Sequence, residues 1–410
     1  MTEISTPAVI INRKTILAVA CASLFACAVS ATILPAALLR AAPAFGVDSE
    51  TLSWVAVTQF SVCFTATIYG GILSDRLGKK PVLVAACLLV MSGAALWSVA
   101  WNMAAAHLAG ALLGMGGGIL ESQGSALLAD CYPERRRWVF TLSQVTYCVG
   151  AVVAPGVIAL LLPMGMSWRI VFIGEAFLSG LLLVSYLLVK MPPPAVGAEG
   201  ELFMESMRLL RRRSVLLPAL ALFGYVLAES GVALYANRHV QVYFSGPERW
   251  AVLGLSLFWA AMLVGRLLCA LLPVDLSPAW LIRVLSACGA VALAAQSLSN
   301  TWITSVALFA LVGLLIGGIW PAIVAVAADL HPQRTGSVVG AVVAIGSVGV
   351  AAAPVLLSTF ISVGGDQHYF TVLAVALLAA VPVLAAVRPV SLTTQVDQSC
   401  AGIFSAKDAT

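Results

Sequence analysis

Twelve long apolar stretches, separated by short polar segments, account for most of this chain. A helix of about 20 apolar residues is long enough to cross the hydrocarbon core of a bilayer. The stretches are residues 15–39, 51–73, 82–101, 105–129, 138–163, 169–190, 214–237, 250–272, 280–299, 302–328, 335–361 and 369–388. The sequence is 61% hydrophobic and 10% charged, which is more apolar surface than one soluble core can bury. We therefore predict an all-α membrane protein with twelve transmembrane helices.

The Lys and Arg residues predict the orientation of these helices, because short cytoplasmic loops are enriched in both. If both termini are cytoplasmic, few of the 22 Lys and Arg residues fall on the outer side, namely Arg40, Arg169, Arg238 and Arg249. We expect a multi-pass protein of the plasma (inner) membrane with cytoplasmic termini. The run 15–39 is too long for the core of a signal peptide, so we expect it to remain as the first helix.

The chain divides into two predicted halves. Residues 1–190 form an N-terminal six-helix half and residues 214–390 a C-terminal six-helix half. Residues 191–213, which are rich in Pro and Arg, are expected to be a cytoplasmic linker, and residues 391–410 a cytoplasmic tail. The halves repeat at an offset of 199 residues, which aligns Gly114 with Gly313, Ala129-Asp130 with Ala328-Asp329, Pro133 with Pro332, and Arg135 with Arg334. Parallel repeats of this kind are typical of transporters built from two rocking halves.

A short charged turn lies between the second and third apolar stretches. Residues 71–80 read Gly-Ile-Leu-Ser-Asp-Arg-Leu-Gly-Lys-Lys. The pattern resembles the signature loop between helices 2 and 3 of the major facilitator superfamily of transporters. The resemblance implies that Asp75 and Arg76 act in gating at the cytoplasmic face. Gly71 would then allow close helix approach, Gly78 would allow the tight turn, and Lys79 would belong to the same loop. The second half lacks such a loop, so we expect a single gate of this type.

Three acidic residues lie well inside predicted spans, and a charge near the bilayer centre costs on the order of 2.5 kcal/mol or more. Glu121 is on the fourth span among glycines, and Glu229 is on the seventh span, one turn from Tyr225. Glu175 is on the sixth span, nearer the outer leaflet. The superfamily's cavity is lined by helices 1, 4, 7 and 10, which favours Glu121 and Glu229 as proton- or substrate-binding residues. The alternative for each is a protonated carboxyl that only packs helices together.

Three segments are similar to a branch of the superfamily, the fucose permease-like transporters. They are residues 223–229 (Phe-Gly-Tyr-Val-Leu-Ala-Glu), residues 114–121 and residues 254–266. The resemblance implies proton-coupled or sodium-coupled sugar transport. The chain departs from the fucose permease in having no acid on the first span, so coupling would run through Glu121 or Glu229.

The remaining candidates for the cavity are uncharged. Polar side chains that can bind hydroxyl groups are Gln59, Gln123, Gln144 and Tyr147, while Trp259 and Trp320 lie too deep to be interfacial anchors and either stack on a solute or pack. Arg266 is the deepest basic residue, and we expect it to extend to the cytoplasmic face. Without a buried cation an anionic substrate is disfavoured, so we predict proton symport of a small neutral polar solute such as a sugar.

Proton-coupled multidrug efflux is the main alternative. Residues 150–156 (Gly-Ala-Val-Val-Ala-Pro-Gly) partly match the helix 5 glycine pattern of drug/proton antiporters, with Ala154 in place of Gly. An enzyme is not expected, because the four His residues fall at span ends or in loops, with no catalytic constellation. The nine Cys residues are scattered singly and predict no metal site or cofactor. We expect a monomer in the lipid bilayer whose partners are a small solute and a proton, with sodium as the alternative ion, and no nucleic acid.

Overall fold

The computed structural model describes residues 12–132, 136–191, 212–272, 276–330, 335–363 and 368–385, and every regular element in these ranges is a helix. The transmembrane-length helices of the first group are α1 (Arg13–Ala41), α2 (Ser49–Leu77), α3 (Lys79–Val99), α4 (Met103–Cys131), α5 (Arg136–Leu161) and α6 (Arg169–Leu188). The second group contains α8 (Arg213–Arg238), α9 (Glu248–Ala270), α10 (Pro278–Gln296), α11 (Trp302–Ile316), α12 (Ile319–Leu330), α13 (Thr335–Ser362) and α14 (Tyr369–Ala385). Short turns of other helix types follow α1, α5 and α8 at Ala42–Phe45, Leu162–Met164 and His239–Tyr243.

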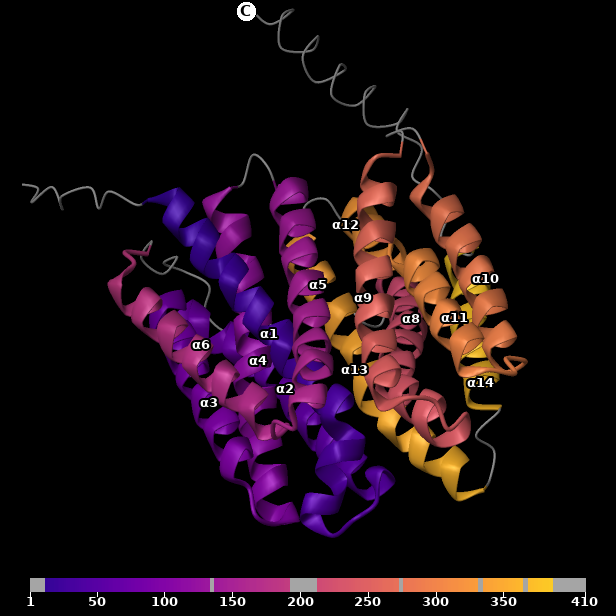
Figure 1. Cartoon of the computed structure of the whole chain (residues 1–410). Helices are drawn as coiled ribbons and strands as arrows, with labels where there is room; N and C mark the ends of the chain where they lie inside the picture. The colour runs from indigo at the N-terminus through magenta and orange to yellow at the C-terminus, as the bar shows by residue number, and fades with distance from the viewer. Residues whose placement is uncertain are drawn as a thin grey trace, which may run out of the picture.

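The two groups of helices stand side by side, α1 to α6 in indigo to magenta and α8 to α14 in rose through orange to yellow (Figure 1). Across the boundary α5 packs against α9, and α2 packs against α13. Most of the predicted linker, residues 192–211, and the whole predicted tail lie outside the described residues.

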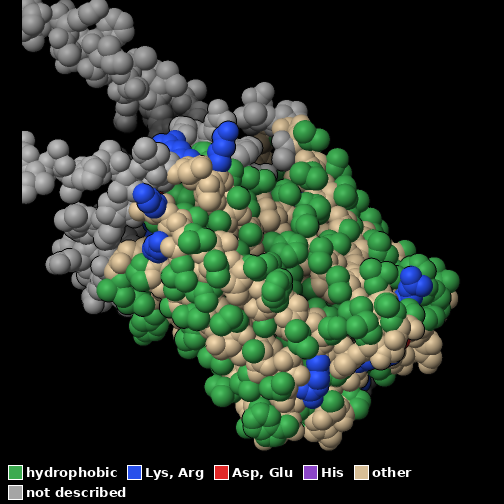
Figure 2. Space-filling view, turned by 60° about the vertical axis from the view of Figure 1, so that its left-hand side comes forward, with side chains coloured by type: hydrophobic (Ala, Val, Ile, Leu, Met, Phe, Trp, Pro, Cys, Tyr) green, Lys and Arg blue, Asp and Glu red, His purple; other side chains and the backbone are tan. Residues whose placement is uncertain are grey.

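The outer surface of the helices is suited to lipid. Eleven helical stretches in the described residues are long and apolar enough to cross a membrane, and α14 contributes a shorter apolar helix, Tyr369–Ala379. Large hydrophobic side chains such as Phe177 and Val291 are exposed. On the face shown in Figure 2, Lys and Arg side chains lie toward two opposite ends, and a broad hydrophobic surface lies between them. Lipid would cover this surface, and the all-helical membrane fold is confirmed.

Close helix contacts repeat between the two groups at the offset of 199 residues. A Cβ atom on Gly114 of α4 would lie 1.9 Å from the carbonyl oxygen of Gln59 on α2. In the second group, a Cβ on Gly313 of α11 would lie 2.2 Å from the carbonyl oxygen of Phe258 on α9. Gly118 against Cys63, and Gly317 against Met262, form a second matching pair. Only glycine fits at such contacts, so the same two-helix packing is built twice from the repeated sequence.

The tenth predicted span is not one continuous helix. The stretch 302–328 is divided into α11 and α12 at Gly317 and Gly318. The carbonyl oxygen of Gly317 accepts a hydrogen bond from Nε of Arg266 at 3.2 Å. Interrupted membrane helices are tolerated where side chains satisfy the freed backbone groups, and Arg266 does so here.

Candidate functional site

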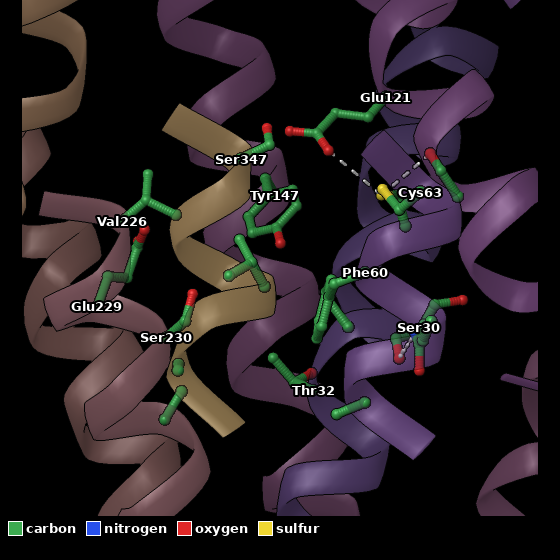
Figure 3. Close-up of a pocket in the computed structure, with 18 of the residues that line it drawn as sticks. Ser30, Thr32, Phe60, Cys63, Glu121, Tyr147, Val226, Glu229, Ser230 and Ser347 are labelled. Carbon is green, nitrogen blue, oxygen red and sulfur yellow. Dashed lines mark hydrogen bonds between the residues drawn. The ribbon is translucent and has the colours of Figure 1, made fainter. Parts of the chain in front are cut away.

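A central cavity of about 140 Å³ lies between the two groups of helices. Its described lining comes from α1, α2, α4 and α5 of the first group and from α8, α9, α12 and α13 of the second. Most of the predicted binding residues line it, namely Gln59, Glu121, Gln144, Tyr147, Glu229, Trp259 and Trp320. Figure 3 shows Glu121 and Glu229 on opposite sides of the pocket, with Tyr147 between them in this view.

Glu121 projects from a nearly bare stretch of α4. Gly117, one turn earlier, and Gly114, two turns earlier, also line the cavity. A Cβ on Gly117 would meet only Sγ of Cys27 at 3.9 Å, so this position leaves space beside the carboxylate. Oε2 of Glu121 is 4.0 Å from Sγ of Cys27 on α1. Among the described residues no cation forms an ion pair with Glu121. The cavity therefore contains a carboxyl group, that of Glu121, for which the described part of the chain provides no ion-pair partner.

Glu229 has a different environment, because it is paired. Its Oε1 lies 3.4 Å from a guanidinium nitrogen of Arg266 on α9 and accepts a hydrogen bond from the Tyr225 hydroxyl at 3.1 Å. The exposed fractions of the Arg266 and Glu229 side chains are 5% and 13%. This geometry corrects the expectation that Arg266 extends to the cytoplasmic face: its side chain turns inward and lines the central cavity.

The N–H groups of the Arg266 guanidinium already donate hydrogen bonds to other protein atoms. Besides Glu229 and the Gly317 carbonyl, a guanidinium nitrogen donates to Oε1 of Gln144 on α5 at 3.0 Å. Arg266 thus connects the two groups of helices. Arg266 and Gln144 also line a second cavity of about 200 Å³, whose other walls come from α10 and α12. The guanidinium neutralises Glu229 and is not left free for an anionic solute.

Two predicted binding residues do not line the cavity. Gln123 is buried between α4 and α2, where its Oε1 accepts a hydrogen bond from the Ser74 hydroxyl at 2.6 Å. Tyr225 is fully buried behind Glu229 and orients that carboxylate. Each residue along a helix turns the side-chain direction by about 100°, so a shift of one or two positions moves a side chain from the cavity face to a helix contact. Apolar windows alone do not resolve this rotation.

Aromatic residues cover one side of the cavity. The rings of Tyr147 on α5 and Trp259 on α9 meet edge to face, with centroids 6.3 Å apart and an interplanar angle of 61°. Trp320, on α12, lies directly after the break in the tenth span. The lining also contains Ser230 and Ser347, which the sequence did not single out. An apolar wall with a few polar groups is typical of a small-molecule site.

The predicted gate lies at the junction of α2 and α3. Gly78 adopts φ +86, which a side chain would disfavour, and a Cβ on Gly71 would meet only Nε2 of Gln123 at 3.8 Å. Lys79 forms an ion pair with Asp130 at the end of α4. Asp75 and Arg76 lie in the last turn of α2, and their side chains fall outside the described part of the chain.

The profile of the Major Facilitator Superfamily matches residues 19–295. The chain belongs to this superfamily. Members of this superfamily are multi-pass membrane transporters, and the cavity lies where the two halves of such a transporter meet. Among the described residues no cluster of His, Cys, Asp and Glu could hold a metal ion.

Curated relatives match part of the transporter. An uncharacterised MFS-type transporter of Mycobacterium tuberculosis is 33% identical over 132 residues, which are 32% of this chain and 31% of that protein. The multidrug resistance protein MdtL of Escherichia coli is 30% identical over 139 residues, which are 33% of this chain and 35% of MdtL. The chain thus aligns with about a third of the length of each relative.

The arrangement of helices is also found in a solved structure. The crystal structure of the E. coli fucose:proton symporter FucP matches with a TM-score of 0.68 at 17% sequence identity. The match covers 90% of this chain and 97% of FucP. At this identity the likeness establishes the fold and leaves the solute to be argued from the cavity.

Proposed function

We propose that this transporter is a proton-coupled symporter that takes up a small neutral polar solute, such as a sugar, by alternating access. It would work as a monomer in the plasma (inner) membrane with both termini in the cytoplasm. The observation that carries the proposal is the Glu121 carboxyl group, which faces the central cavity without an ion-pair partner among the described residues.

An unpaired carboxyl in this position suits proton coupling. A charged carboxylate is costly at membrane depth. While Glu121 is unprotonated, closing the cavity and removing its water is therefore unfavourable. Protonation of Glu121 removes the charge and lets the loaded cavity close. A solute that binds the protonated form is then carried together with its proton.

The charges of the cavity also favour a neutral solute. Glu229 and Arg266 neutralise each other, and protein atoms occupy the guanidinium donors. An anion would have to displace these contacts, whereas the hydroxyl groups of a neutral solute can form hydrogen bonds with Ser230, Ser347 and Gln144. The apolar face of such a solute can stack on Trp259 or Trp320. The FucP fold, whose solved example is named a fucose:proton symporter, supports a sugar as the first solute class to test.

Proton-coupled efflux of a cationic drug is the second candidate. The same unpaired Glu121, with Phe60, Tyr147 and Trp259 around the cavity, would attract an aromatic cation. The partial match to MdtL points in the same direction. In that case drug and proton would compete for Glu121 rather than bind together.

The test is the pH outside lightly buffered, de-energised cells that express the transporter, measured while a panel of sugars and then cationic drugs is added. We expect a sugar to make the medium alkaline, because protons enter with it, and Glu121→Gln to abolish the response. Glu50→Gln at the start of α2, outside the cavity lining, is the matched control and should respond like the wild type. If only drugs cause proton movement, the symport proposal is wrong and drug efflux is favoured.

A further inference from the structure

A third carboxyl inside the helix bundle, that of Glu175, lies outside the described cavity lining. The inward face of α6 is formed by residues spaced three and four apart, and Glu175 stands in the middle of it with an exposed fraction of 2%. Lipid-facing side chains such as Phe177 lie on the opposite side of the helix. The sequence alone assigned Glu175 no distinct role, because the sixth helix does not line the central cavity.

Glu175 is only partly satisfied by hydrogen bonds. The hydroxyl of Ser30 on α1 donates to its Oε1, while Oε2 is buried without a partner among the described residues. One turn along α6, the hydroxyl of Ser179 is likewise buried and unpartnered. A carboxylate anion in this position would need more donors than it has, so the environment suits a group that holds a proton.

Joining α1 to α6 does not by itself require an acid. The same two helices are connected further along by Ser23 and Tyr186, whose hydroxyl oxygens are 2.6 Å apart. Neither of these groups is charged at neutral pH. The Ser23–Tyr186 contact is thus an internal reference for what a purely structural bond between α1 and α6 looks like.

Ser30 connects Glu175 to the central cavity. Ser30 is itself a lining residue of the cavity, and its carbonyl oxygen accepts a hydrogen bond from the Gln59 amide at 3.2 Å. One turn earlier on α1, Cys27 lines the same cavity and lies beside Glu121. Cys27 and Ser30 of α1 therefore lie between two carboxyl groups, that of Glu121 on α4 and that of Glu175 on α6.

The remaining surroundings of Glu175 are uncharged among the described residues. Its helix packs mainly against α3 and α1 and touches α5. The titratable group on these helices that interacts with Glu175 is the buried thiol of Cys27 on α1, whereas the buried thiol of Cys87 on α3 lies by Tyr186. Tyr147 of α5 faces Glu121 and Glu229 instead. Since no described cation forms an ion pair with Glu175, a proton is the means of neutralising its charge that the described surroundings leave.

We propose that Glu175 is a second proton-binding site of the transporter, reached from the central cavity through the Ser30 hydroxyl. In the loading step, Ser30 gives its hydroxyl proton to the carboxylate and takes one from a hydronium ion in the cavity. The serine is unchanged, the carboxylate becomes a neutral carboxyl, and one water is released. The inference rests on the proposed proton coupling and adds a second carrier of protons beside Glu121.

Infrared difference spectroscopy of the purified transporter, between alkaline and acidic buffer, tests the site without any solute. We expect a reversible carboxylic C=O band on acidification that is lost in Glu175→Gln and shifted in Ser30→Ala, where its hydrogen bond is missing. Tyr186→Phe, which removes the other bond between α1 and α6, should leave the band unchanged. If no titrating band depends on Glu175, the residue is structural and the proposal is overturned.

A transport measurement separates this proposal from the proposed function. With a solute that moves protons through the wild type, we expect Glu175→Gln to keep solute exchange at equilibrium and to lower the number of protons carried per solute. An unchanged ratio would overturn the proposal even if the wild type is a symporter. If no solute moves protons through the wild type, the proposed function fails, and the infrared titration still decides whether Glu175 binds a proton.

Discussion

Arg266 shows how one side chain can fix the electrostatics of a membrane cavity. Its 3.4 Å contact with Glu229 is buried, and removing one partner of a buried ion pair costs about 3–5 kcal/mol because the other charge is left uncompensated. We expect Arg266→Met to lower the thermal stability in detergent strongly. Adding Glu229→Gln to Arg266→Met should restore much of the loss. Two purely additive losses would show that the pair does not act as a unit.

The sequence predicted the acidic half of this site but not the basic half. Glu121 and Glu229 were identifiable because a carboxylate in the middle of an apolar span is costly and therefore marks a position with a function. Arg266 lies one turn from the end of α9, where a long side chain can extend either outward or inward. The direction depends on Glu229, which faces it from another helix. The one sign in the sequence that a cation would turn inward was Glu229 itself, an acid in the middle of a span with no basic residue near it on the same helix.

At the scale of helices, close packing depends on glycines that leave no room for a side chain. A Cβ on Gly114 would meet the Gln59 carbonyl at 1.9 Å, and overpacking of this kind costs about 1–3 kcal/mol. We expect Gly114→Ala to lower the unfolding temperature. Gly124→Ala on the same helix is the matched control, because its Cβ would meet only the Ala20 carbonyl at 3.9 Å. Equal effects of both substitutions would contradict a packing role for Gly114.

Helix ends were predicted well, because apolar windows end where charged and polar residues begin. The observed helices start and stop within a few residues of the predicted spans. The break between α11 and α12 was missed because residues 302–328 are apolar throughout, so hydropathy gives no sign of it. The break coincides with contacts to another helix, α9: Gly317 packs against the Met262 carbonyl, and its own carbonyl oxygen accepts a hydrogen bond from Arg266.

For the whole molecule, the two groups of helices are tied together at the end predicted to face outward. Asn237 near the end of α8 donates to the carbonyl oxygens of Pro35 and Ala36 on α1, both at 2.9 Å. Arg40 of α1 pairs with Glu248 of α9 at 2.5 Å. These contacts hold the predicted outer entrance closed, so they must break when the cavity opens to the outside.

Asn237→Ala should therefore shift the transporter toward the outward-open state. We expect a membrane-impermeant maleimide added outside the cells to modify Cys27 and Cys63, which line the cavity, several-fold faster than in the wild type. Gln241→Ala, at the same end of the molecule but outside these contacts, should label at the wild-type rate. Unchanged labelling in Asn237→Ala would show that the contact does not control access.

The most direct test of proton coupling through Glu121 is solute accumulation in proteoliposomes with an imposed proton gradient, comparing the wild type with Glu121→Gln. We expect the wild type to concentrate a neutral solute against its gradient. The variant should still exchange labelled for unlabelled solute at equilibrium but no longer concentrate it. If Glu121→Gln still couples accumulation to the proton gradient, Glu121 does not carry the coupling proton and the proposed mechanism is wrong.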